Sequence, residues 1–170
     1  MNKNQNCTVE PIRKRQHIEA IKDALAVNPR DTALFQIGIN AGLRGTDLLR
    51  LKWLDVLSDE GQIKKVIELN ESKTKKLRRI AISPNMRKAI ETWLGACTPD
   101  RHSTGASSKS RTIDRCDLTK HELLFPNGKD RPMTIQRLHQ LVNEWARKAD
   151  IQGHFGSCGG RDLNRAKRPV

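Results

Sequence analysis

An arginine stands at the break between two apolar stretches in the first third of the sequence. Arg44 lies between Gly42 and Gly45, after the apolar segment 33–39 and before a leucine-rich segment, 48–54. A guanidinium fixed at such a turn is costly to bury unless an anion faces it, and its planar fork of donors suits a phosphate. The same cation could instead satisfy the last carbonyl groups of the preceding helix. The residues by themselves leave both roles open.

A second candidate group is the basic run between residues 73 and 88, which contains seven cations and no acid. The run begins with Lys73, Lys75, Lys76, Arg78 and Arg79. On a β-turn that projects from a domain, such residues can follow the phosphates of a DNA groove. A charge run is also the usual composition of a solvated loop. The run alone therefore indicates DNA binding without excluding a merely soluble surface.

The overall composition favours a polyanionic partner. Lys and Arg number 32 against 19 Asp and Glu, a net charge of +13, and nucleic acid is the usual polyanion for such a chain. Aromatic residues make up 4% of the sequence and there is no tyrosine. This scarcity argues against single-strand binding by base stacking and against RNA binding. Double-stranded DNA is thus the expected partner, and we expect no small-molecule cofactor.

The cysteines and the hydropathy pattern indicate neither a metal site nor a membrane segment. Cys7, Cys97, Cys116 and Cys158 lie far apart, with no C-x-x-C pair, so a zinc site is not predicted. No apolar run approaches twenty residues, and no signal peptide is visible. We therefore expect no membrane partner, reduced thiols and a cytoplasmic location.

The elements that must position these cations follow from periodicity and capping signals. Ile18, Ile21 and Leu25 predict a first helix across about 16–27, which Pro29 ends, and Asp31 is a candidate cap for the apolar helix. That helix should be buried on all sides. After the break, Thr46 or Asp47 would cap one further helix with apolar positions through Leu54. The other predicted elements are strands at 64–69 and 78–82, a helix from Ser83 and Pro84 onward, and a helix over 134–149.

These elements predict an α+β fold that is mostly helical, with a small antiparallel β-sheet from the 62–82 strands. Residues 122–126 are a candidate third strand. Polar, aperiodic composition predicts a loose arm at 1–14 and a mobile insertion at 98–117. Gly- and Arg-rich composition predicts a disordered tail at 154–170.

The first candidate site also resembles a known family. The run Gly42-Leu43-Arg44-Gly45-Thr46-Asp47, continuing to Trp53, resembles the first arginine box of the tyrosine recombinases, or phage integrases. The resemblance implies that Arg44 binds the scissile phosphate and that Asp47 supports the fold around it. The run 73–82 is similar to the hairpin of the same family. It implies that Lys73, with Lys75 as the fallback, protonates the leaving 5′ oxygen, although Ala81 replaces the usual proline.

The resemblance fails in the last sixth of the chain. The sequence Gly153-His154-Phe155-Gly156-Ser157 is similar to the lead into the family's His-x-x-Arg motif. Arg161 then holds the place of the second arginine, but Cys158 stands where the histidine should be, and neither the third motif nor the nucleophilic tyrosine follows. A truncation, a frameshift near codon 158 or a cloning artefact would each explain this end. We expect an incomplete catalytic domain over 15–153 that lacks its C-terminal helices.

Two classes of function agree with these observations. The first is a site-specific recombinase catalytic domain whose cleavage chemistry is lost in this chain because the tyrosine is absent. The second is a non-enzymatic remnant or competitor that only binds duplex DNA. Missing helices would expose apolar surface, so self-association, including on DNA, is expected in either case.

Overall fold

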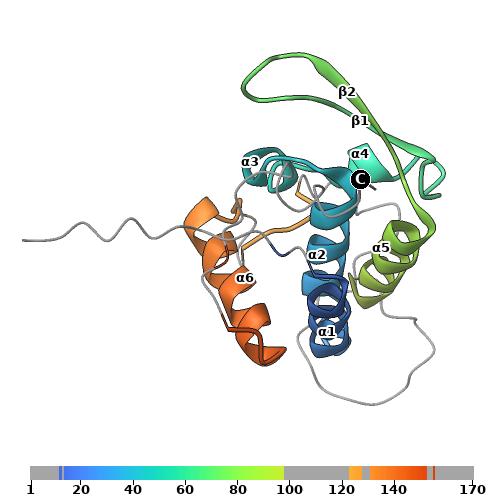
Figure 1. The fold of residues 1–170 in the computed structure, drawn as a ribbon. Coiled ribbons are helices and arrows are strands. Elements are labelled where there is room, and N and C mark those ends of the chain that lie inside the picture. Colours follow the sequence, from blue (N-terminus) through green and yellow to red (C-terminus); the bar gives the residue numbers. More distant parts are fainter. Residues whose placement is uncertain (1–11, 13, 98–122, 128–130, 153–154, 156–170) are drawn as a thin grey trace, which may run out of the picture.

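The computed structural model describes residues 12, 14–97, 123–127, 131–152 and 155. Its elements in chain order are α1 (Arg15–Leu25), α2 (Pro29–Ala41), α3 (Gly45–Leu48), α4 (Trp53–Val56), β1 (Val66–Asn70), β2 (Leu77–Ala81), α5 (Pro84–Cys97) and α6 (Ile135–Lys148). The described part is mostly helical, with one two-stranded antiparallel sheet (Figure 1), which confirms the predicted fold class. The insertion at 98–117 lies outside the described residues, as do the arm except positions 12 and 14 and the tail except position 155. Of these, Ile12 is buried.

Helix α2 is the centre of the fold. Its residues 33–39 are all buried, which confirms the prediction of a helix without a solvent face. α1, α3 and α5 pack directly against it, and α6 packs against α1 and α3. In Figure 1, α5 and α6 accordingly flank the α1–α2 pair. No helix in the described ranges is long and apolar enough to cross a membrane.

The start of α2 differs from the sequence prediction. Pro29 does not simply end the preceding helix; it occupies the first turn of α2, where its missing N–H is no loss. Asn28 is the cap, and its Oδ1 accepts from the Asp31 N–H at 3.2 Å. Asp31 therefore lies inside the first turn, where a carboxylate is favoured by the helix dipole. It is buried, and its Oδ2 accepts from Trp145 Nε1 of α6 at 3.1 Å.

The segment after α2 is also different from the prediction of one further helix. α2 ends at Gly42 in the left-handed conformation, with φ of 59°, a position that favours glycine. Two single-turn helices, α3 and α4, then follow. Between them Lys52 is extended, and the Leu51 carbonyl accepts from the Leu124 N–H at 2.7 Å. α4 starts afresh where the Lys52 N–H donates to Asp55 Oδ2 at 2.7 Å.

The β1–β2 hairpin confirms the two predicted strands to within two residues at each end. The register pairs Ile67 with Ile80, and both are buried. Leu69 and Ile82 are partly buried against the same core, so the apolar faces are those predicted. In Figure 1 the hairpin rises from the helices, beyond α3 and α4. Its turn therefore lies at the end of the molecule where α2 gives way to α3.

The predicted third strand is wrong. Within the described residues the sheet contains β1 and β2 alone. Segment 123–127 instead forms an isolated bridge between Pro126 and Pro132, and Leu124 bonds to the α3–α4 connection. Its apolar character serves the core, since Leu124 and Phe125 are fully buried.

The two long helices α5 and α6 are both present as predicted, and α5 begins at Ser83 and Pro84 as expected. Ser83 Oγ accepts from the Met86 N–H at 3.3 Å, and Thr134 Oγ1 accepts from the Arg137 N–H at 3.2 Å. α5 buries Met86, Ala89, Ile90 and Leu94, and α6 buries Leu138, Leu141, Val142, Trp145 and Ala146. Together they enclose α1 and α2 and leave the hairpin end accessible.

Candidate nucleic-acid interface

Arg44 occupies the cap position before α3, and its side chain is 29% exposed. Its Nη1 donates to Glu71 Oε2 at 2.9 Å and lies 3.9 Å from Asp47 Oδ2. Among the described residues, the helix-capping contact that Arg44 could have made is made by another side chain: Arg78 Nη2 donates to the Ala41 carbonyl at 3.1 Å. Arg44 is thus held by carboxylates at the end of α2, with part of its guanidinium open to solvent.

Glu71 is the residue that gathers these cations, and sequence reasoning did not single it out. Besides Arg44, its carboxylate accepts from Thr74 Oγ1 at 2.8 Å and from Arg78 Nη1 at 3.1 Å. These hydrogen bonds lower the pKa of the Glu71 carboxyl from 4.5 to about 2. The bond from Thr74 has the largest effect, followed by those from Arg44 and Arg78. The available signal was that Glu71 is the one acid between Glu68 and Glu91, at the threshold of the basic run.

Asp47 attaches the same turn to α3 from a second point. Its Oδ1 accepts from the backbone N–H of Ser72 at 2.9 Å and from the Ser72 hydroxyl. Asp47 is buried, with 5% exposure, and its Oδ2 has no hydrogen bond to any described residue. Two carboxylates therefore tie successive turn residues, Glu71 and Ser72, to the Arg44 segment. These bonds bring Lys73, the next residue, to the same place.

The predicted DNA-binding cations divide into exposed and anchored residues. Lys73, Lys75 and Lys76 are exposed, and none of them forms an ion pair with another described residue. Arg79 is also exposed, and its Nε pairs with Glu68 Oε1 at 2.8 Å, a surface pair of little energetic value. Arg78 is anchored instead, as described above.

The positive charges of Arg44 and Arg78 are balanced by the negative charges of Asp47 and Glu71. The three exposed lysines of the turn therefore add positive charge that these carboxylates do not balance. A surface that joins a partly exposed guanidinium to a cluster of free ammonium groups can hold the backbone of a nucleic acid. Arg161, Cys158 and His154 lie outside the described residues, so the second arginine of the predicted site is not placed.

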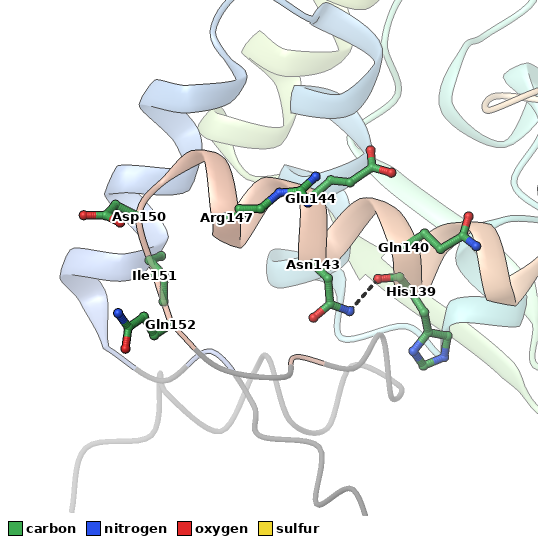
Figure 2. A pocket seen from close by; sticks show the side chains of 8 residues that line it. All are labelled: His139, Gln140, Asn143, Glu144, Arg147, Asp150, Ile151 and Gln152. Carbon is green, nitrogen blue, oxygen red and sulfur yellow. Dashed lines mark hydrogen bonds between the residues drawn. The ribbon is translucent and has the colours of Figure 1, made fainter.

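A separate hollow runs along the polar face of α6 and is far less suited to a polyanion. Figure 2 shows its lining side chains: His139, Gln140, Asn143, Glu144, Arg147, Asp150, Ile151 and Gln152. The acids offset the single arginine. Asn143 is engaged in holding the chain, since it donates to the Phe155 carbonyl at 2.9 Å and accepts from the Phe155 N–H at 3.0 Å. No cluster of metal-ligating side chains occurs in the described ranges.

Comparisons with known proteins agree with this fold. The model of the phage integrase family matches residues 13–162. The chain therefore belongs to the phage integrase family, and its fold is that of the tyrosine recombinase catalytic domain. It is 41% identical over 83 residues to the probable integrase/recombinase YoeC of Bacillus subtilis (strain 168), an alignment that covers 48% of this chain and 43% of YoeC.

The solved structures share the fold at low identity. The XerA recombinase aligns with a TM-score of 0.61 at 14% identity, covering 92% of this chain and 48% of XerA. The lambda integrase catalytic core aligns with a TM-score of 0.60 at 11% identity, covering 92% of this chain and 80% of the core. XerH bound to palindromic difH substrate aligns with a TM-score of 0.58 at 18% identity, covering 94% of this chain and 42% of XerH. The chain thus spans less than half the length of YoeC, XerA and XerH.

Proposed function

We propose that this chain binds duplex DNA as part of a site-specific recombinase catalytic domain. The observation that carries the proposal is the placement of Arg44 beside the hairpin turn with its exposed Lys73, Lys75 and Lys76. Arg44 has five donors, and one of its nitrogens bonds Glu71. Its remaining donors can bind a phosphate oxygen while that bond persists. The solved XerH and lambda integrase complexes contain DNA, which supports the same partner here.

The resemblance to the family supports the following proposed roles for the individual residues. Arg44 would neutralise charge on the phosphate, and Lys73 would protonate the leaving 5′ oxygen, with Lys75 as the fallback. Arg161 would be the second arginine. Lys75, Lys76 and Arg79 would hold the flanking backbone. Arg78 contributes indirectly, because it fastens the hairpin to the end of α2.

The 170-residue polypeptide has no tyrosine, so it has no group for the covalent step of this family. We therefore propose that it holds DNA without cleaving it. The same fact favours the second candidate function, a non-enzymatic duplex-binding remnant or competitor for recombination sites. Self-association on DNA belongs to the proposal, since a lambda integrase fragment was solved as a dimer on a core site. The proposal also keeps the cytoplasmic location expected from the sequence.

A salt titration tests the proposal. Duplex affinity, followed by fluorescence anisotropy, should fall steeply between about 50 and 200 mM salt, with little dependence on sequence. The double variant Lys75→Gln/Lys76→Gln should reduce the slope of log affinity against log salt by roughly 2, about 0.9 for each lost phosphate contact. Arg147→Gln/Lys148→Gln on α6 is the matched control and should leave the slope unchanged. Equal effects of the two pairs would refute an interface at the hairpin.

A further inference from the structure

Glu71 controls the shape of the hairpin turn through its backbone as well as its side chain. Its N–H donates to the Lys76 carbonyl at 3.0 Å, and its carbonyl accepts from the Lys75 N–H at 2.9 Å. Lys75 adopts the left-handed conformation, with φ of 56°. The turn 71–76 is therefore closed on Glu71 itself. Its carboxylate then joins this closed turn to Arg44, which lies 27 residues earlier in the chain.

The side chains of Arg44, Arg78 and Glu71 differ in their exposure to solvent. Arg44 is 29% exposed and Arg78 is 36% exposed, whereas Glu71 is only 15% exposed. The Glu71 side chain is thus the least exposed of the three. It occupies one nitrogen of Arg44, so the other donors of that guanidinium can bind a phosphate while Glu71 stays in place.

We propose that Glu71 is a positioning residue for DNA binding: it orients the Arg44 guanidinium and holds Lys73 beside it before DNA arrives. The inference rests on the proposed function. A carboxylate near a phosphate site repels the ligand, so its net effect is favourable only if the order it imposes outweighs that repulsion. Preorganised donors lose less freedom on binding, which is how Glu71 would raise affinity despite its charge. The carboxyl is charged at neutral pH, and its hydrogen bonds lower its pKa to about 2.

The decisive comparison is between Glu71→Gln and Glu68→Gln. Both variants remove one negative charge from the hairpin, but Glu68 is 52% exposed and pairs only with exposed Arg79 among the described residues. Positioning by Glu71 predicts that Glu71→Gln weakens duplex binding by about tenfold, whereas Glu68→Gln leaves it unchanged or slightly tighter. Tighter binding by Glu71→Gln than by Glu68→Gln would overturn the proposal, because it would show that Glu71 competes with phosphate. Equal binding would overturn it as well.

A double-mutant cycle with Arg44→Gln separates positioning from general destabilisation. If Glu71 acts through Arg44, the penalty of Glu71→Gln should largely vanish in the Arg44→Gln background. A persistent penalty in that background would refute the coupling. Thr74→Val is a milder variant for the case that Glu71→Gln does not fold: it removes one donor to the carboxylate and keeps every charge. It should weaken duplex binding by about twofold, and no change would count against the proposal.

Amide hydrogen exchange, measured without DNA, distinguishes a failure of the positioning role of Glu71 from a failure of the proposed function. Glu71→Gln should speed amide exchange across residues 71–76, including the Ser72 N–H that Asp47 binds, and Glu68→Gln should not. If the unaltered chain fails to bind duplex DNA, the proposed function fails whatever the exchange result. If it binds and the exchange rates in the turn do not respond to Glu71→Gln, only the positioning role fails.

Discussion

The base and the tip of one hairpin use positive charge in opposite ways. At the base, Arg78 is bound to Glu71 and to the Ala41 carbonyl, and Arg44 is bound to the same carboxylate. At the tip, Lys73, Lys75 and Lys76 are exposed and form no ion pair with other described residues. The first set builds the structure and the second set is available to a ligand. Cations of one charge run therefore cannot be treated as one surface.

The largest expected effect concerns covalent DNA cleavage, a step that neither set of cations can perform. Electrostatic groups can hold a phosphate, but covalent cleavage in this family needs a tyrosine, and the polypeptide contains none. We predict no covalent protein–DNA adduct on a nicked suicide substrate, measured by denaturing gel electrophoresis. A trapped adduct would show that another side chain attacks, and it would contradict the proposal that this chain holds DNA without cleaving it.

The next effect tests whether an anchored arginine also binds DNA. Arg44→Ala should weaken duplex binding by about tenfold or more, because it removes a partly desolvated guanidinium from the phosphate site. The melting temperature should change little, since Glu71 keeps Thr74 and Arg78 as donors. Arg79→Ala, at an exposed ion pair, is the control and should lower affinity far less. A large loss of stability without a loss of affinity would make Arg44 a purely structural residue.

A smaller effect is expected on stability at the second carboxylate. Asp47→Ala leaves the Ser72 N–H and hydroxyl without their partner and should lower the free energy of unfolding by roughly 1–3 kcal/mol. Urea denaturation measures this difference. Asp47→Asn keeps an acceptor oxygen and should lose less. If both variants are as stable as the original chain, the turn is held by Glu71 alone.

The smallest effect is the pH dependence of the Glu71 contacts. The pKa of Glu71 is lowered from 4.5 to about 2 in the folded state. Its contribution to stability is therefore complete above pH 4.5 and is lost progressively as the pH falls toward 2. The stability difference between the original chain and Glu71→Gln should be constant from about pH 7 to 5 and shrink below 4.5. A difference that already shrinks near neutral pH would show that the carboxylate lacks these donors.

Much of the fold followed from local signals. Ser83 and Pro84 predicted the start of α5, apolar periodicity predicted α6, and alternating isoleucines predicted the strands. Prediction failed where a distant group decided the outcome. The segment after Gly45 is not one helix, and its Leu51 carbonyl bonds to Leu124, far along the chain. The start of α2 was misread because Asn28 and Pro29 together make a better cap than the later Asp31.

The site was predictable only in part for the same reason. Arg44 and Lys73 were identified from motif spacing, which records chemistry that local sequence can carry. The anchoring of Arg78 and the hub role of Glu71 depend on contacts across 37 and 27 residues. In a count of net charge, a single acid such as Glu71 among many cations changes the total very little. The structure shows that this acid binds Arg44 and Arg78, whereas the three turn lysines form no ion pair with any described residue.

The sequence separations of these contacts also bear on the order in which the molecule folds. Every bond that joins the hairpin turn to the α2–α3 junction closes a loop of at most 37 residues. The Trp145–Asp31 bond, which joins α6 to the start of α2, closes a loop of 114 residues. Shorter loops cost less entropy to close and tend to form faster. During synthesis from the N-terminus, all the residues of this cluster emerge from the ribosome before α6 does. We therefore expect the hairpin end to reach its native contacts first, and α6 to dock last.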